Sequence, residues 1–88
     1  MAWTIEFKPN ARSELKRLDR PVQRRIRQFL RERVLAISDP RQLGKPLHGD
    51  KRDLWSYRVG DYRIICMIED RRLVVVVVSV RHRREAYR

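Results

Sequence analysis

Alternating apolar and polar residues open the chain. Trp3, Ile5 and Phe7 are separated by Thr4 and Glu6, which is the two-residue period of a strand with one buried face. The pattern predicts a first strand over residues 3–7, ended by the Lys-Pro-Asn sequence that follows it.

Two stretches with apolar residues at helical spacing come next. They span residues 11–18 and 22–37, with Asp19-Arg20-Pro21 between them and an Asp-Pro dipeptide at 39–40 that ends the second. Their apolar members are Ala11, Leu15 and Leu18, then Val22, Ile26, Phe29, Leu30, Val34 and Ile37. Because the connection is short and contains proline, we expect an antiparallel helix hairpin whose apolar stripes face one common surface.

The second half of the chain reads as strands. Residues 41–53 hold two of the three glycines and lack a sustained period, which predicts a surface loop. Two strand-like runs, 54–59 and 62–68, flank Gly60-Asp61, which is typical of a two-residue hairpin turn. A second hairpin through Asp70-Arg71 leads into the apolar run 73–80, whose five consecutive valines predict a central strand, because such a run would aggregate at a sheet edge.

The first hairpin turn dictates which residues share a face. If Gly60 and Asp61 form the turn, Arg58 lies opposite Arg63, on the face away from the core. The same register carried through the second turn places Val78 opposite Arg63. The core face would hold Trp55, Tyr57, Val59, Tyr62, Ile64, Cys66 and Ile68. The open face would add Ile65, Met67, Val74, Val76 and Val78 to the arginines, and such an apolar area suggests a protein partner.

These elements predict a single α+β domain over residues 1–88. Its order is β-α-α-β-β-β, an antiparallel sheet with the N-terminal helix hairpin packed on one face. A chain of 88 residues excludes a multidomain enzyme. The single Cys66 excludes an internal disulfide and a thiolate zinc cluster, and it fits a packing role in a reducing cytosol.

Charge and apolar content narrow the function classes. There are 22 Lys+Arg against 11 Asp+Glu, a net charge of +11, yet 42% of the residues are hydrophobic, too many for a disordered basic tail. A folded polyanion binder is therefore expected. The longest apolar run is too short to span a bilayer and the N-terminus does not resemble a signal peptide, so we expect a cytoplasmic protein without a membrane partner.

Several arginines are candidates for an anion site. Like charges facing each other across a ladder are destabilising, and a bound phosphate would relieve the repulsion between Arg58 and Arg63. The alternative is that either arginine lies in solvent or pairs with Asp61 or Glu69. The exposed helix backs, which carry Arg24, Arg25, Arg27, Arg31 and Arg33, are expected to be solvated, or to contact phosphates of a nucleic-acid partner.

The last residues carry the densest positive charge and the remaining candidate chemistry. His82 could transfer a proton, or it could cap the strand end or pair with Glu85. Tyr87 could act as a base if surrounding cations favour its phenolate, or it could stack on a nucleobase. The carboxylates are too scattered along the chain to suggest a metal site, so a mechanism without metal or cofactor is expected.

Two segments carry a family resemblance that covers essentially the whole chain. The Arg-Val-Gly-Asp-Tyr-Arg turn at 58–63 and the terminal His-Arg-Arg-Glu-Ala-Tyr at 82–87, in this order of elements, resemble the RelE/ParE superfamily of type II toxins. The resemblance implies a cognate antitoxin, with a toxin–antitoxin heterotetramer as one compatible assembly. It also implies one of two activities: metal-independent mRNA cleavage on the ribosome in the RelE-like branch, or poisoning of DNA gyrase in the ParE-like branch.

Site residues follow from the same resemblance. It implies catalytic roles for Arg63, Arg83 and Tyr87, to which the chemistry of the tail adds His82. Substrate-binding roles are expected for Arg58, Lys51, Arg52, Arg81 and Arg84. RelE-like nucleases often carry lysine where this chain has Ser56, which favours the gyrase alternative. A non-toxic basic RNA-binding module is the third hypothesis, and the terminal motif argues against it.

Overall fold

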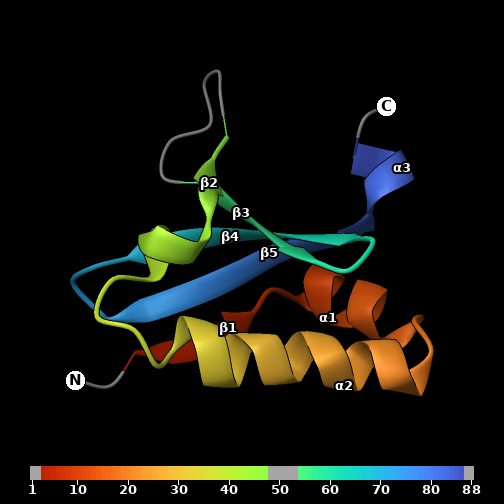
Figure 1. The fold of residues 1–88 in the computed structure, drawn as a ribbon, viewed down its shortest axis with the longest axis horizontal. Coiled ribbons are helices and arrows are strands. Elements are labelled where there is room, and N and C mark those ends of the chain that lie inside the picture. The colour runs from red at the N-terminus through yellow and green to blue at the C-terminus, as the bar shows by residue number, and fades with distance from the viewer. Residues whose placement is uncertain (1–2, 48–53, 87–88) are drawn as a thin grey trace.

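A computed structural model describes residues 3–47 and 54–86. Two α-helices lie on one face of a five-stranded sheet, as Figure 1 shows. The elements are β1 (Thr4–Phe7), α1 (Pro9–Lys16), α2 (Arg20–Phe29), a π-helical turn η1 (Leu30–Val34), a 3₁₀ turn η2 (Pro40–Leu43), β2 (Lys45–Pro46), β3 (Leu54–Val59), β4 (Tyr62–Glu69), β5 (Val74–His82) and α3 (Arg83–Ala86). The predicted α+β class and element order are confirmed, with β2, the two short turns and α3 as additions.

The valine strand lies inside the sheet, as its composition predicted. The strand order is β1-β5-β4-β3-β2, so β5 has a neighbour on each side. The pairs from β5 to β2 are antiparallel, whereas β1 runs parallel to β5, with Thr4 beside Val74 and Phe7 beside Val77. The expectation of a purely antiparallel sheet is wrong for this one pair, because α1 and α2 carry the chain from β1 to the other half of the sheet before β5 forms.

The core lies between the helices and the sheet. Its buried members are Trp3, Ala11, Leu15, Ile26, Leu30, Val34, Tyr57, Val59, Ile64, Cys66, Ile68, Val75, Val77 and Val80. Both predicted helix stripes contribute to it. Burial raises the pKa of the Cys66 thiol, which fits the packing role. Among the described residues, no helix is long and apolar enough to cross a membrane.

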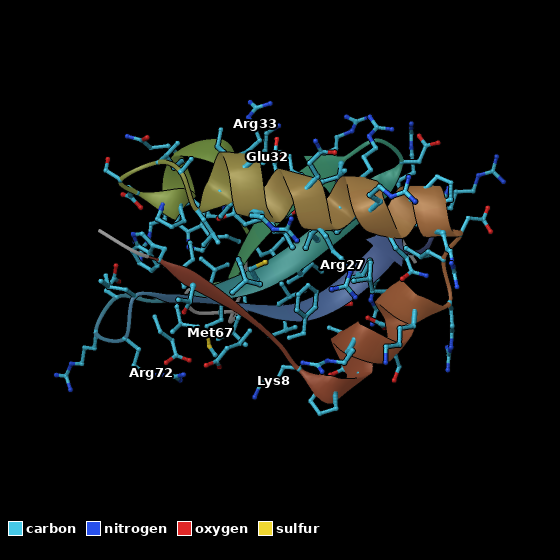
Figure 2. All side chains as sticks on the ribbon, turned by 90° about the horizontal axis from the view of Figure 1, so that it is seen from below. Lys8, Arg27, Glu32, Arg33, Met67 and Arg72 are labelled. Atoms are coloured by element: carbon cyan, nitrogen blue, oxygen red, sulfur yellow. The ribbon has the colours of Figure 1, made fainter. Side chains whose placement is uncertain are left out.

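Helix α2 and the η1 turn that continues it direct their arginines away from that core. Arg24, Arg25, Arg27, Arg31 and Arg33 are exposed, and Figure 2 shows Arg33 projecting outward from the helix. Arg27 instead reaches back over the Phe7 ring, with its guanidinium carbon 5.8 Å from the ring centroid. The aliphatic stems of such arginines cover apolar surface while their charges stay in water.

The first hairpin has the predicted register. Arg58 lies opposite Arg63 and Val59 opposite Tyr62, and the turn has a positive φ of 59° at Gly60, as a type II′ turn requires. Residues alternate between a buried and a more open face along both strands. The turn residues alone were therefore sufficient to predict which side chains face away from the helices.

The second hairpin corrects the predicted pairing of Val78 with Arg63. Arg63 lies opposite Arg81. Two features shift the register: the turn spans residues 70–73 with Leu73 at a φ of 53°, and a bulge interrupts the ladder between Ile65 and Cys66. The turn is two residues longer than expected and the bulge adds one more residue to β5, which accounts for the shift from 78 to 81.

The predicted apolar open face is smaller than expected. Val74 and Val76 are only 4% and 5% exposed, lying on β5 between β1 and β4. Ile65, Met67 and Val78 are partly exposed. The predicted loop over 41–53 is also corrected within the described residues, because η2 and β2 form there.

Candidate anion-binding site

Three arginines stand side by side across three strands. The register places Arg58 on β3 opposite Arg63 on β4, and Arg63 opposite Arg81 on β5. Paired residues of an antiparallel sheet lie about 4.5–5.5 Å apart at Cα and share a face. We call Arg58, Arg63 and Arg81 the arginine row. Three adjacent positive charges repel one another, and a bound anion would offset that repulsion by attracting all three.

A small pocket opens beside the arginine row at the β3–β4 turn. Its lining includes Arg58, Arg63 and Arg83 together with Gly60, Asp61 and Tyr62, and its volume is about 40 Å³. A cavity needs about 10–15 Å³ of such volume to hold one water molecule. The pocket therefore has room for a few atoms of the size of a phosphate oxygen.

The end of β5 brings Arg83 to this pocket. The Arg83 backbone N–H donates to the Asp61 carbonyl at 2.7 Å, which ties the start of α3 to the first hairpin turn. In Figure 1, α3 and the β3–β4 turn lie at the same end of the sheet. Residues about 20 positions apart thus contribute guanidinium groups to one pocket.

The ion pairs observed within residues 3–47 and 54–84 involve Arg41 and Arg72. Asp70 accepts two hydrogen bonds from Arg41, at 3.0 and 2.6 Å, and Glu6 and Glu69 pair with Arg72. Among the described side chains, Arg58, Arg81 and Arg83 form no ion pair. The alternative in which Glu69 neutralises the arginine row is therefore excluded, since Glu69 forms its ion pair with Arg72.

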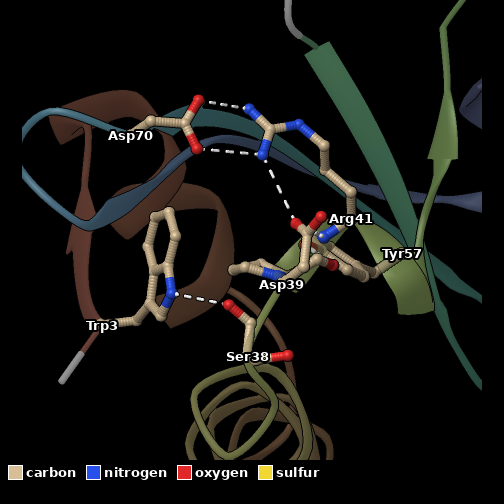
Figure 3. A network of polar contacts seen from close by, with 7 residues as sticks. Trp3, Ser38, Asp39, Arg41, Tyr57 and Asp70 are labelled. Atoms are coloured by element: carbon tan, nitrogen blue, oxygen red, sulfur yellow. Dashed lines mark hydrogen bonds and ion pairs between the residues drawn. The ribbon is translucent and has the colours of Figure 1, made fainter. Parts of the chain in front are cut away.

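A polar network holds the Arg41 segment in place at the opposite end of the sheet. Figure 3 shows Arg41 between Asp70 and Asp39, and the Trp3 indole N–H donating to the Ser38 carbonyl at 3.3 Å. The hydrogen bond to Arg41 lowers the pKa of Asp70, and the same bond raises the pKa of Arg41. The ion pairs of Arg41 with Asp39 and Asp70 thus lie at the end of the sheet opposite the first hairpin turn.

His82 caps the last helix. Its Nδ1 accepts a hydrogen bond from the Arg84 backbone N–H at 3.2 Å, which assigns the proton of the neutral ring to Nε2. The ring also contacts Tyr62 edge-on, with centroids 5.2 Å apart. The His82 side chain thus caps the start of α3 rather than the end of β5, and the neutral ring keeps its proton on Nε2.

The remaining predicted residues divide into two groups. Arg84 is exposed and lines a hollow with Asp61, His82 and Arg83. Lys51, Arg52 and Tyr87 lie outside the described residues.

Sequence reasoning missed Lys45. It lies on β2 directly opposite Ser56 on β3, so a lysine faces the position where a lysine of the strand itself was expected. Gly44 permits the close approach, because a Cβ at this position would lie 3.1 Å from the Tyr57 ring. The available signal was a glycine and a proline flanking a lysine, which is also the pattern of an ordinary loop.

Comparison with known proteins agrees with the fold. Residues 5–87 match the family described as the ParE toxin of the type II toxin–antitoxin system parDE. The toxin RelG of Mycobacterium tuberculosis is 32% identical over 100% of this chain and 99% of its own length. The toxin RelE of the same organism is 38% identical over 59% of this chain and 54% of its own.

Solved structures show the same architecture. The toxin–antitoxin complex RelBE2 of Mycobacterium tuberculosis contains a chain with a TM-score of 0.84 at 28% identity, covering 93% of this chain and 99% of that one. A mutant of the Escherichia coli toxin RelE in the free state gives a TM-score of 0.78 at 26% identity, over 99% and 90%. With its family match across nearly the whole sequence, its full-length relative and its sheet-and-helix-pair fold, this chain belongs to the RelE/ParE superfamily of type II toxin–antitoxin toxins.

Proposed function

We propose that the protein cleaves mRNA on the ribosome as the toxin of a type II toxin–antitoxin pair. The reaction is an attack of the ribose 2′-hydroxyl on the adjacent phosphorus. The hydroxyl loses its proton, the P–O5′ bond breaks, and the 5′-oxygen gains a proton, leaving a 2′,3′-cyclic phosphate and a 5′-hydroxyl end. The reaction requires a base, an acid and stabilisation of the additional negative charge at phosphorus.

The observation that carries this proposal is the pocket lined by Arg58, Arg63 and Arg83. A guanidinium group stays protonated and holds two phosphate oxygens in a planar fork. Arginines from three segments around a pocket of phosphate-oxygen size would bind the scissile phosphate most strongly when its charge is highest. Positive charge from side chains performs the task that a metal ion performs in other nucleases, so the mechanism requires no metal.

Proton transfer is assigned to the C-terminal segment. His82 lies next to Arg83, and as an imidazolium it can give its Nε2 proton to the leaving oxygen. The transfer leaves the neutral ring, whose Nδ1 can accept from the Arg84 backbone N–H. Tyr87 is proposed as the base or as a stacking surface for a nucleobase. Arg81, Arg84, Lys51 and Arg52, with Lys45 as an addition, are proposed to bind flanking phosphates of mRNA and rRNA.

An antitoxin is the proposed protein partner. The most similar solved chain described above comes from a RelBE2 toxin–antitoxin complex. With a net charge of +11 on this chain, an acidic segment laid over the arginine row would bind strongly and block access of RNA. A heterotetramer of two toxins and two antitoxins is a compatible assembly.

The test is primer extension on mRNA after addition of the protein to a translation extract. Cleavage should appear at defined positions within translated codons and require ribosomes. Arg63→Ala and Arg83→Ala should each reduce the rate by about 10- to 100-fold, since each removes a charge-assisted hydrogen bond. The matched control is Arg72→Gln, which removes the same charge at the other end of the sheet. Intact mRNA with the wild-type protein would refute the proposal.

Inhibition of DNA gyrase is the second candidate function. It is favoured by the match to the ParE family and by Ser56 at a position where RelE-like nucleases often carry lysine. It predicts that induction causes DNA damage and a stalled gyrase–DNA complex while mRNA remains intact. Supercoiling assays with purified gyrase, run beside the extract assay, distinguish the two functions.

A further inference from the structure

Beyond the end of β1, side chains of helix α1 form hydrogen bonds with the backbone edge of β5. Up to Val77 the edge is paired with β1, with a final hydrogen bond from Lys8 N–H to the Val77 carbonyl at 2.9 Å. Beyond that point two side chains of α1 replace the missing strand. Asn10 Nδ2 donates to the Val78 carbonyl at 2.9 Å, and Glu14 Oε1 accepts from the Val80 backbone N–H at 2.9 Å.

The Glu14 carboxylate also begins a series of side-chain hydrogen bonds that runs through Ser79 to Arg81. Ser79 Oγ donates to Glu14 Oε1 at 3.4 Å, and Arg81 Nε donates to Ser79 Oγ at 2.9 Å. Ser79 is only 8% exposed, so its hydroxyl is largely withdrawn from water. Because the hydroxyl proton points to Glu14, its lone pairs face Arg81, and one group accepts while it donates.

The contact to Ser79 affects how Arg81 can bind an anion. Nε is occupied, so the two terminal nitrogens form the edge of the guanidinium that can hold two phosphate oxygens. A free arginine side chain samples many rotamers and must be ordered when a ligand binds. An arginine already bonded through Nε loses part of that freedom before the substrate arrives.

We propose that Ser79 and Glu14 are positioning residues that hold Arg81 in the arginine row with its terminal nitrogens directed at the RNA backbone. This inference rests on the proposed mRNA cleavage. It extends the site to α1, which sequence analysis treated only as a core helix. Neither Ser79 nor Glu14 touches the substrate; both act through Arg81.

The first test is a pair of substitutions at Ser79. Ser79→Ala removes the acceptor and should lower the single-turnover cleavage rate on programmed ribosomes by about tenfold, the value of one hydrogen bond to a charged group at the low end of its range. Ser79→Thr keeps the hydroxyl, suits a strand, and should restore the rate to within about twofold of wild type. A threonine variant as slow as the alanine variant would overturn the proposal.

A double-mutant cycle separates positioning from a general structural effect. In an Arg81→Ala background the Ser79 hydroxyl has no arginine to hold, so Ser79→Ala should cause no further loss of rate. An equal tenfold loss in both backgrounds would show that Ser79 acts through the fold and would overturn the proposal.

A spectroscopic readout makes the inference independent of activity. The Arg81 Nε–Hε signal in a ¹H–¹⁵N spectrum should exchange slowly with solvent in the wild type, rapidly in Ser79→Ala, and slowly again in Ser79→Thr. Glu14→Gln, which keeps an acceptor oxygen, should retain slow exchange, whereas Glu14→Leu should lose it. An Arg81 signal indifferent to these changes refutes the positioning role, whereas absence of cleavage by the wild type refutes the proposed function.

Discussion

The arginine row should make the protein less stable than it would be without it, and Arg58→Gln measures the cost. Arg58 is exposed, forms no ion pair among the described side chains and lies directly opposite Arg63. Unit charges held at the Cα spacing of a strand pair, about 5 Å, would repel in water by roughly 0.8 kcal/mol, which sets an upper value because long side chains can separate the charges further. The substitution should therefore raise the free energy of unfolding by about 0.2–0.8 kcal/mol.

Salt dependence tests the electrostatic origin of the effect. The Debye length falls from about 10 Å at 0.1 M salt to about 3 Å at 1 M. For charges about 5 Å apart, screening over these lengths reduces the interaction to about a third of its low-salt value. Urea denaturation of both proteins at the two salt concentrations gives the comparison.

A matched control accounts for the high overall charge. Arg24→Gln removes one exposed charge from α2, away from the row, and reports the general relief of repulsion in a chain of net charge +11. Arg58→Gln should exceed this control in stability at 0.1 M salt while losing cleavage activity by about 10- to 100-fold. A gain no larger than that of Arg24→Gln, or one unchanged by salt, would refute the reasoning.

Three further predictions concern stability. Tyr57→Phe leaves the buried Pro40 carbonyl without the hydroxyl that donates to it at 2.7 Å, so the free energy of unfolding should fall by about 1–3 kcal/mol in urea titrations; an unchanged midpoint would contradict this. The ion pair with Arg41 lowers the pKa of Asp70 in the folded state, so its stabilisation is complete above the ordinary value of about 3.9 and is lost as pH falls through the lower folded value. Asp70→Asn should flatten that acid limb in unfolding curves followed below about pH 4, and an identical limb would exclude the contribution. Gly60→Ala places a side chain at a φ of 59° and should cost about 1–2 kcal/mol in the same assay, whereas wild-type stability would show that the turn tolerates Cβ.

Local chemistry explains why much of this molecule was predictable. The first hairpin turn consists of only two residues, so Gly60 predicted that Arg58 lies opposite Arg63 without knowledge of the tertiary structure. The valine run predicted its own place inside the sheet. The terminal motif predicted the family, which the comparisons confirmed.

The second turn was less predictable because its sequence lacks the glycine that usually marks a residue with positive φ. Leu73 adopts a positive φ of 53°, a conformation that glycine usually occupies. The bulge near Cys66 leaves no mark in the sequence at all. Both features depend on how β5 fits between β1 and β4, and together they exchange Val78 for Arg81 as the partner of Arg63.

The amino-acid sequence by itself determined the two long helices and the four main strands, the helix-covered face, the charge and the pair of arginines at the first turn, because each depends on residues near one another along the chain. Only the tertiary structure decided that Arg81 completes the row, that Lys45 faces Ser56, and that Glu14 of α1 reaches Arg81 through Ser79. Such contacts join residues that are distant in the chain. Their geometry follows from strand register and helix placement, which the whole core stabilises together and no local pattern encodes.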